Sequence, residues 1–403
     1  MSTLPRKWDF AGHAPGGHHL FTGRQHHENM RVALVTESFL PQVNGVSNTV
    51  RHTVDRLLER GHTPLLIAPG PGPGSYRGCP VVRVRSFELP RYRTFPVALP
   101  DSTVERTIRR FAPDVVHLAS PIVLGAAGLR AARRLGIPTV AVYQTDVAGF
   151  ARQYGVRADL LLDRWVGHIH RRASRTLAPS QASREQLEAL GVRDLHIWRR
   201  GVSLDLFDPA RRDEELRDSW TGSVPTSTVV GYVGRLAPEK QVRRLRELAL
   251  LPGTTLVVIG DGPERAWLER QLPGARFTGI LRGPALARAF ASLDVFVHPG
   301  EAETFCQTVQ EAQASGVAVV APASGGPLDL VEHRRTGLLY PPGDTVLLRA
   351  HVAELAGDPD QRARMANRAR AVVAVRTWEH VVDQLIDVHY VAVLGPDSTL
   401  MAA

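Results

Sequence analysis

The chain has little cysteine and no long apolar run, and each shortage excludes a class of protein. Two cysteines among 403 residues are too few for a disulfide framework or a cysteine zinc site. The longest apolar runs, such as Val317–Ala321, fall far short of the roughly 20 residues that cross a bilayer. Because 43% of the residues are apolar, a largely disordered chain is also excluded. We therefore expect a soluble or peripheral protein of a reducing compartment, the cytoplasm.

Lysine is also scarce, although the formal net charge is +9. Only Lys7 and Lys240 are lysines, and the other basic residues are arginines. A GC-rich coding bias explains such a preference; alternatively, the positive charge serves an anionic partner. The arginines are scattered, and no zinc finger, RNP-like aromatic motif or basic tail accompanies them. Nucleic acid is therefore not an expected partner.

The length favours two domains over a single core. Residues 1–29 hold five of the sixteen histidines, show no periodicity and lack the apolar stretch of a signal peptide, so we expect a disordered leader. From Met30 onward, short apolar segments alternate with helical patterns, and the alternation restarts after Asp208. The polar stretch Arg211–Ser227 is interpreted as a linker between the two halves.

Short apolar segments predict the strands of two sheets. In the first half they are Val32–Thr36, Pro64–Ala68, Val81–Val84, Asp114–Leu118, Thr139–Val142, Arg175–Ala178 and His196–Trp198. In the second half they are Thr228–Val233, Thr255–Ile259, Arg276–Thr278, Val295–His298 and Val317–Ala321. Strands without polar alternation, each followed by a helix, predict parallel sheets covered on both faces. The expected fold is α/β, with two doubly wound, Rossmann-like domains facing a cleft, the usual place for a ligand.

Several common catalytic motifs are missing from this scaffold. The first strand of neither half is followed by G-x-G-x-x-G, and the chain has no Walker A sequence, no H-E-x-x-H and no G-x-S-x-G. Hydride transfer, NTP hydrolysis, zinc proteolysis and α/β-hydrolase chemistry are therefore not favoured.

A basic turn follows the first predicted strand of the second half. Residues 234–240 read Gly-Arg-Leu-Ala-Pro-Glu-Lys, so Arg235 and Lys240 flank a proline turn. In a protein that otherwise uses arginine, a lysine here offers the compact point charge that suits a phosphate oxygen in a tight space. The pair predicts a diphosphate site; alternatively, two solvated charges flank a loop.

Two glutamates mark the next segment, 299–315. Glu303 lies in a loop, and we expect a helix to start at Thr304 and Phe305, with free N–H groups that form an anion site. Glu311 follows eight residues later, about two turns on, and is predicted to reach a ribose beside the phosphates. Alternatively, Glu303 only complements the helix dipole and Glu311 is a surface charge.

The first half offers fewer candidates. Gly45 precedes a helix after the first strand and permits close backbone approach to a ligand. Gln144 and Asp146 follow the strand Thr139–Val142 and are predicted to point into the same cleft. Asp146 suits an acceptor-binding or acid–base role, and a helix-cap role equally.

These motifs resemble glycosyltransferase family 4, retaining enzymes of the GT-B fold. The resemblance rests on Gly-Arg-Leu-x-x-Glu-Lys at 234–240, Gly-Asp-Gly-Pro at 260–263 and the E-x7-E segment with its trailing Ala-x-Ala-Ser-Gly. Segments 37–48, 114–121, 143–146 and 303–311 are similar to actinobacterial GDP-mannose-dependent α-mannosyltransferases, which build mannosylated glycolipids of the cell envelope. The similarity runs from about residue 30 to residue 390.

The resemblance implies a hexosyltransferase that uses GDP-mannose and a lipid-linked acceptor. It implies an acceptor-binding domain 30–207, a nucleotide-sugar domain 208–377, a helix 378–393 that crosses back to the first domain and a tail 394–403. The implied catalytic residues are Arg235, Lys240 and Glu303; the implied donor-binding residues are Gly45, Gly234, Thr304, Phe305 and Glu311; acceptor or sugar contacts fall to Gln144 and Asp146. Many family members have histidine where this chain has Gln144, which cannot shuttle a proton.

Electrostatic stabilisation of the leaving diphosphate by these basic groups would need no divalent metal. A lipid acceptor would also need a route to the membrane, and a basic face of the first half could dock on the inner leaflet. The arginines concerned are Arg83, Arg85, Arg91, Arg93, Arg106, Arg109, Arg110, Arg171, Arg172 and Arg175. Alternatively, they form an ordinary solvated surface.

Three other functions remain open. The donor is a UDP- or ADP-sugar and the acceptor a small molecule; or the scaffold is that of a sugar-nucleotide epimerase or a phosphorylase; or the protein binds anions without catalysis. No local pattern separates guanine from uracil, and the sequence alone does not give the sugar or the acceptor.

Overall fold

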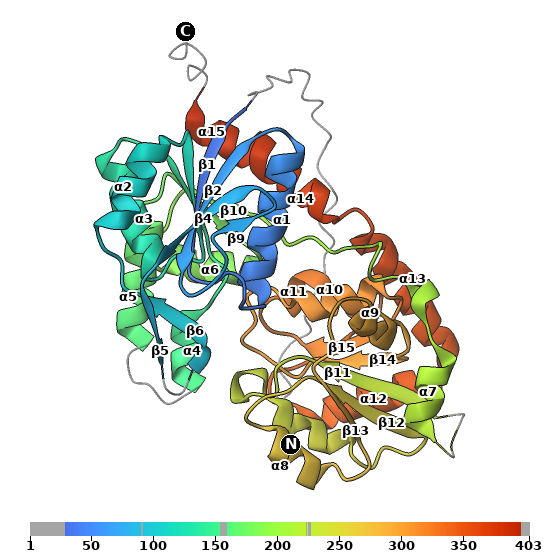
Figure 1. Cartoon of the computed structure of the whole chain (residues 1–403). Helices are drawn as coiled ribbons and strands as arrows, with labels where there is room; N and C mark the ends of the chain where they lie inside the picture. The colour runs from blue at the N-terminus through green and yellow to red at the C-terminus, as the bar shows by residue number, and fades with distance from the viewer. Residues whose placement is uncertain (1–28, 90–91, 154–158, 223, 225–226, 396–403) are drawn as a thin grey trace.

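A computed structural model describes residues 29–89, 92–153, 159–222, 224 and 227–395, which form two α/β units with a sheet each (Figure 1). Residues 1–28 of the expected leader, Arg91 and residues 396–403 of the expected tail lie outside the described residues. Within the described ranges, no helix is long and apolar enough to cross a membrane.

The N-terminal unit has an eight-stranded sheet with the order β10-β9-β8-β7-β1-β2-β4-β3. Its strands are β1 Arg31–Thr36, β2 Thr63–Pro69, β3 Ser75–Tyr76, β4 Cys79–Val84, β7 Val115–Ala119, β8 Thr139–Val142, β9 Arg175–Ala178 and β10 Leu195–Ile197. All pair in parallel except β3 with β4. The helices are α1 Gly45–Glu59, α2 Ser102–Phe111, α3 Leu124–Arg134, α4 Val147–Gln153, α5 Asp159–His170 and α6 Gln181–Ala189. Helices on both faces explain why the central strands are continuous apolar runs.

The C-terminal unit has a six-stranded parallel sheet with the order β13-β12-β11-β14-β15-β16. Its strands are β11 Thr228–Val233, β12 Thr254–Ile259, β13 Arg276–Gly279, β14 Val295–Val297, β15 Ala318–Pro322 and β16 Leu338–Tyr340. Its α-helices are α7 Glu214–Thr221, α8 Arg265–Gln271, α9 Gly283–Ala291, α10 Gln307–Ala314, α11 Pro327–Leu330, α12 Thr345–Gly357 and α13 Pro359–Val373. Short 3-10 turns are η1 Pro209–Arg211, η2 Pro238–Lys240 and η3 Val242–Leu248.

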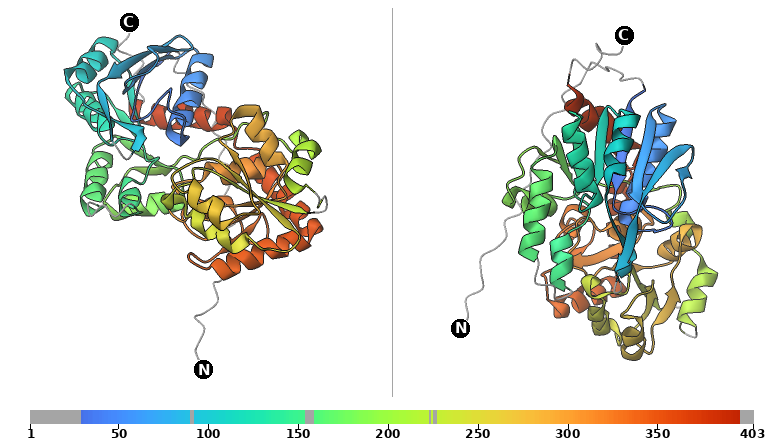
Figure 2. Two further views of the ribbon diagram at one scale, coloured as in Figure 1. Left: turned by 60° about the horizontal axis from the view of Figure 1, so that its bottom comes forward. Right: turned by 60° about the vertical axis from the view of Figure 1, so that its left-hand side comes forward.

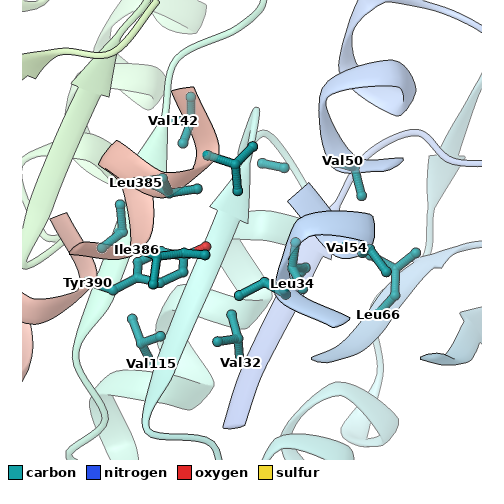
Figure 3. Close-up of a cluster of buried hydrophobic side chains, with 14 of the residues drawn as sticks. Val32, Leu34, Val50, Val54, Leu66, Val115, Val142, Leu385, Ile386 and Tyr390 are labelled. Carbon is teal, nitrogen blue, oxygen red and sulfur yellow. The ribbon is translucent and has the colours of Figure 1, made fainter. Parts of the chain in front are cut away.

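The last helical segment returns to the N-terminal unit, as both figures show for the red ribbon (Figures 1 and 2). It consists of α14 Trp378–Gln384, the π-helical η4 Leu385–Tyr390 and α15 Val391–Leu394. Its apolar side chains share one buried cluster with β1 and β7, where Ile386 and Tyr390 lie beside Val32 and Val115 (Figure 3). Ion pairs to Asp383 and Asp387 come from Arg56 of α1 and from Arg60, the residue that caps its C-terminus, and they hold the polar side of the segment.

All the predicted strands are present, with bounds within two residues of those expected. The prediction of a linker over Arg211–Ser227 was wrong for its centre, which is helix α7. Asp213 caps that helix by accepting the Leu216 N–H at 2.9 Å, and Trp220 is buried in the C-terminal core. A polar helix of about two turns, fixed by one tryptophan, has too little periodicity to be recognised in sequence. The antiparallel hairpin β5 Ser86–Leu89 with β6 Tyr92–Ala98 was also not predicted.

Candidate active site

The loops that follow β11 and β14 lie side by side, because these parallel strands are neighbours in the sheet and end at the same edge. The β11 loop carries Gly234 and then η2 with Lys240, and the β14 loop carries Glu303. The β11 loop lies close to the end of β12: a Cβ on Gly260 would lie 1.9 Å from the Gly234 carbonyl oxygen. Position 260, beside the basic turn, therefore requires glycine.

Lys240 and Glu303 form an ion pair at this edge. The Lys240 Nζ atom lies 2.5 Å from Glu303 Oε1, and the same oxygen is 3.2 Å from Nε2 of the buried His298. Burial alone would raise the pKa of Glu303, but Lys240 and His298 outweigh it and hold that pKa at about 2. Burial would lower the pKa of Lys240, and Glu303 raises it instead. The Glu303 carboxylate thus stays ionised at neutral pH, between the Lys240 ammonium and the His298 ring.

His298 adds a second positive group. Burial opposes its protonation, but interactions with Cys306 and with the Glu303 carboxylate raise its pKa to about 9. The ring and the Lys240 ammonium thus place two cationic groups beside the Glu303 carboxylate. Such groups favour an anionic ligand.

Arg235 lies apart from this pair. Its guanidinium lies 3.6 Å from Glu239 Oε1, and 38% of its side chain is exposed. The structure therefore brings Lys240 and Glu303 together, while the carboxylate beside Arg235 is that of Glu239. The rotamer freedom of an exposed arginine lets it turn toward a ligand.

The helix after Glu303 starts later than predicted. Helix α10 begins at Gln307, not at Thr304, because Cys306 adopts a left-handed conformation with φ 74°. Phe305 is buried, and Thr304 links the two units: its hydroxyl donates to the Gln144 carbonyl oxygen at 3.0 Å, and its own carbonyl accepts from Ser183 Oγ at 3.3 Å. The backbone of Thr304 and Phe305 is thus an irregular loop that precedes the helix.

Glu311 lies on α10, one turn after the helix begins, and is half-buried. Burial raises the pKa of Glu311 to about 8, against the effect of a hydrogen bond from Gln307. A carboxyl group with such a pKa is poised to ionise when donors such as ribose hydroxyls approach it.

On the N-terminal side, Gln144 and Asp146 follow β8. Gln144 is buried, and its Nε2 has no hydrogen-bond partner among the described residues. Asp146 accepts the Gly149 N–H at 2.8 Å at the start of α4 and also receives Gln186 Nε2 at 3.3 Å. Asp146 therefore serves as a local helix cap, whereas Gln144 keeps a free amide for a ligand.

The sequence analysis missed Arg200, which lies between β10 and the C-terminal unit. Its side chain is buried, and Nη2 donates to Gln144 Oε1 at 3.3 Å. A Cβ on Gly45, the first residue of α1, would lie 2.5 Å from Arg200 Nη1. Gly45 is thus a position of close approach, as expected, but the approaching group in this structure is a guanidinium. Nothing in the local sequence distinguishes this arginine from the many others.

One trio of side chains has the geometry to hold a cation. Ligand atoms of His298, Glu303 and Cys306 all lie within 4.8 Å of one another. Imidazole, carboxylate and thiolate suit zinc, but the Lys240 ammonium lies on the Glu303 oxygen that a metal ion would use and would repel it. The arrangement therefore favours the ammonium–carboxylate pair.

Sequence comparison gives relatives over nearly the whole chain. Residues 43–206 match Glycosyltransferase Family 4 and residues 214–372 match Glycosyl transferases group 1. A GDP-mannose-dependent alpha-mannosyltransferase of Mycolicibacterium smegmatis is 51% identical over 91% of this chain and 98% of its own length. A protein of the same description from Mycobacterium tuberculosis is 50% identical over 93% of this chain and 99% of its own. The sulfoquinovosyl transferase SQD2 of Arabidopsis thaliana is 33% identical over 90% of this chain and 74% of its own.

Solved structures share the fold at low sequence identity. Sucrose-phosphate synthase from Thermosynechococcus elongatus superposes with a TM-score of 0.74 at 18% identity, over 90% of this chain and 98% of that one. Anabaena Alr3699/HepE in complex with UDP superposes with a TM-score of 0.71 at 21% identity, over 89% of this chain and 99% of that one. The two facing Rossmann-like units are the GT-B architecture. With relatives at half identity along nearly their full length, the chain belongs to glycosyltransferase family 4.

Proposed function

We propose that this protein is a retaining α-mannosyltransferase that moves mannose from GDP-mannose to a lipid-linked acceptor, a glycolipid or phosphatidylinositol mannoside. The observation that carries the donor is the 51% identity to the M. smegmatis GDP-mannose-dependent alpha-mannosyltransferase over 91% of the chain. The partly buried Lys240–Glu303 pair supplies a matching anion site at the edge of the C-terminal sheet.

The proposed reaction breaks the bond between the anomeric carbon of mannose and its phosphate oxygen. Negative charge then grows on the leaving GDP, and Lys240, Arg235 and the backbone N–H groups of Thr304 and Phe305 stabilise it. Lys240 would share its protons between Glu303 and the phosphate. Glu303, kept ionised by its low pKa, accepts hydrogen bonds from sugar hydroxyls.

Retention follows when the acceptor hydroxyl attacks from the side that the phosphate leaves. The new bond joins the acceptor oxygen to the anomeric carbon, and the acceptor proton passes to the departing phosphate oxygen. Contact between the two units through Thr304 and Gln144 brings both substrates to one boundary and limits access of water. On this proposal, a divalent metal is not required.

The donor assignment is tested by ligand-induced stabilisation of the full chain with GDP, UDP and ADP side by side. A ligand at 100 times its Kd stabilises the protein by about 2.7 kcal/mol. We expect GDP to raise Tm by several degrees and UDP and ADP to raise it much less at equal concentration. A larger rise in Tm with UDP or ADP than with GDP would still fit a glycosyltransferase, but it would contradict GDP-mannose as the donor. An equal rise in Tm with all three would show that the protein does not select the guanine base.

For the acceptor, we propose a membrane-docking face on the N-terminal unit, at the inner leaflet. Exposed basic side chains lie on α2, α3 and the end of α5; they are Arg106, Arg109, Arg110, Arg130, Arg133, Arg134 and Arg172. On α5, Leu160, Leu161 and Trp165 are exposed. Apolar side chains beside a basic face suit an anionic bilayer surface.

Some of the arginines predicted for docking serve the fold instead. Arg83 donates to the carbonyl oxygens of Leu40, Pro69 and Pro73, and Arg175 pairs with Asp194. We therefore propose the docking face over α2, α3 and α5, and not around Arg83.

Vesicle co-sedimentation measures this docking. We expect the protein to bind vesicles that contain roughly 30% phosphatidylglycerol. Most of this binding should be lost when salt is raised from about 50 to about 500 mM, because the Debye length then shortens about threefold. The variant Leu160→Ser/Leu161→Ser with Arg130→Gln and Arg133→Gln should lose at least about tenfold in affinity, since each surface base contributes about 1 kcal/mol. Leu250→Ser/Val346→Ser, on exposed sites of the C-terminal unit, is the control. If the N-terminal variant binds the vesicles as tightly as the C-terminal control, the proposed docking face is wrong.

A further inference from the structure

Arg200 places a guanidinium at the point where the two units meet. It donates to Gln144 Oε1 at 3.3 Å, and it packs over Gly45. On the other side, its Cζ atom lies 6.0 Å from the centroid of the Phe305 ring. The side chain thus contacts two N-terminal positions and, at the same time, the loop of the C-terminal unit that follows β14 and carries Glu303 and Phe305. We call this loop the donor loop.

Arg200 forms no ion pair within the described part of the chain, although the Glu303 carboxylate attracts it at longer range. The side chain is buried at 8% exposure, its single hydrogen-bond acceptor is a neutral amide oxygen, and its Nε has no partner there. The neighbouring cations are balanced differently: Lys240 lies on Glu303, and Arg199 lies 3.7 Å from Asp329. A buried guanidinium that is in contact with no carboxylate favours the binding of an anion beside it. Burial lowers the pKa of Arg200 to about 10, which still leaves it charged at neutral pH.

The backbone holds Arg200 in a fixed place relative to the donor loop. Its carbonyl oxygen accepts Gln310 Nε2 at 3.0 Å, and the Gly201 carbonyl accepts Gln307 Nε2 at 2.9 Å, both from helix α10. A Cβ on Gly201 would lie 2.5 Å from the Trp378 Cα, so the returning helix closes the other side. Such anchoring makes Arg200 a preorganised group and not a mobile surface charge.

We propose that Arg200 is a further donor-binding residue, whose guanidinium binds the sugar-linked phosphate of the nucleoside diphosphate sugar from the side opposite Lys240. This inference rests on one part of the proposed function, namely that a nucleoside diphosphate binds where the two units meet. The planar fork of an arginine suits two oxygens of one phosphate. The same side chain holds Gln144 in place, so the phosphate and the sugar contact would be set together.

The test compares GDP with GMP, which lacks the second phosphate, by calorimetry on the full chain. Arg200→Met should weaken GDP binding about 10- to 100-fold, as expected for a hydrogen bond to a charged group, and GMP binding less than about threefold. Arg200→Lys keeps the charge without the fork and should lie between wild type and Arg200→Met. The matched control is Arg199→Met, which removes an adjacent arginine paired with Asp329 and should leave both affinities unchanged.

Three results would overturn the inference. A folded Arg200→Met protein that binds GDP like wild type removes any role in binding. If Arg200→Met and Arg200→Lys both weaken GDP and GMP equally and lower Tm, the side chain is only structural. If wild type binds none of GDP, UDP and ADP, the proposed function fails and this inference fails with it. If wild type binds GDP and Arg200→Met binds it equally well, only this inference fails, and the proposed function stands.

Discussion

Replacing Lys240 by methionine should lower kcat about 10²- to 10³-fold, as removal of one preorganised charge at a leaving group does, while KM for the donor changes less. The reason is its position: Lys240 ends η2, in the turn that follows β11, and its Nζ atom lies 2.5 Å from Glu303 Oε1. Its charge matters most when the diphosphate separates from the sugar. Steady-state kinetics with GDP-mannose measure both constants.

Stability must be separated from turnover in this variant, because loss of Lys240 removes one of the two ion-pair partners of Glu303 and leaves His298. The double variant Lys240→Met/Glu303→Gln removes the stranded charge and should recover Tm without recovering kcat. Arg243→Met is the matched control, since Arg243 is an exposed base on η3 that pairs with Glu264, and it should keep wild-type kcat. Normal turnover by folded Lys240→Met would contradict the assignment of the site.

The second large effect concerns Glu311. Glu311→Ala should raise the Kd for GDP-mannose about 10- to 100-fold through loss of hydrogen bonds to an ionised carboxylate, with little change in kcat. Burial sets the pKa of Glu311 at about 8 in the free protein. Ribose hydroxyls bind the ionised carboxylate, so below this pH the Glu311 carboxyl group must lose its proton before the donor binds. Donor affinity should therefore rise with pH up to about 8, by as much as tenfold per unit below it.

The pH profile identifies Glu311 directly when Glu311→Gln is compared with wild type between pH 6.5 and 8.5. The variant should bind more weakly and lose the dependence on pH. Deprotonation of His298, with a pKa of about 9, sets the upper limit of the rise. Glu332→Gln, at an exposed glutamate, is the control. A wild-type Kd that does not change with pH would show that Glu311 does not ionise on binding.

Much of the fold was predictable because buried parallel strands are short, uninterrupted apolar runs, as in β1 and β11. The two wrong predictions, of the linker over α7 and of the start of α10, concern features that the fold as a whole decides. Helix α7 is fixed by the burial of Trp220, and the start of α10 is displaced by the left-handed Cys306. Neither has a local pattern of its own.

The same distinction applies to the site. Lys240 and Glu303 could be proposed together because each follows a strand of one parallel sheet, and such strand ends meet at one edge. Arg200 could not, because its burial and its approach to Gly45 arise only when the two units pack. In a chain so rich in arginine, composition does not distinguish this buried arginine from the exposed ones.

The most direct test of the mannosyltransferase assignment incubates the purified full chain with GDP-[¹⁴C]mannose and a membrane lipid extract and follows label into the organic phase. The proposal predicts an α-linked mannolipid, formed with GDP-mannose but not with UDP- or ADP-sugars, in the presence of EDTA. Label that stays in the aqueous phase as a new nucleotide sugar, formed without any acceptor, would identify an epimerase and contradict the proposal.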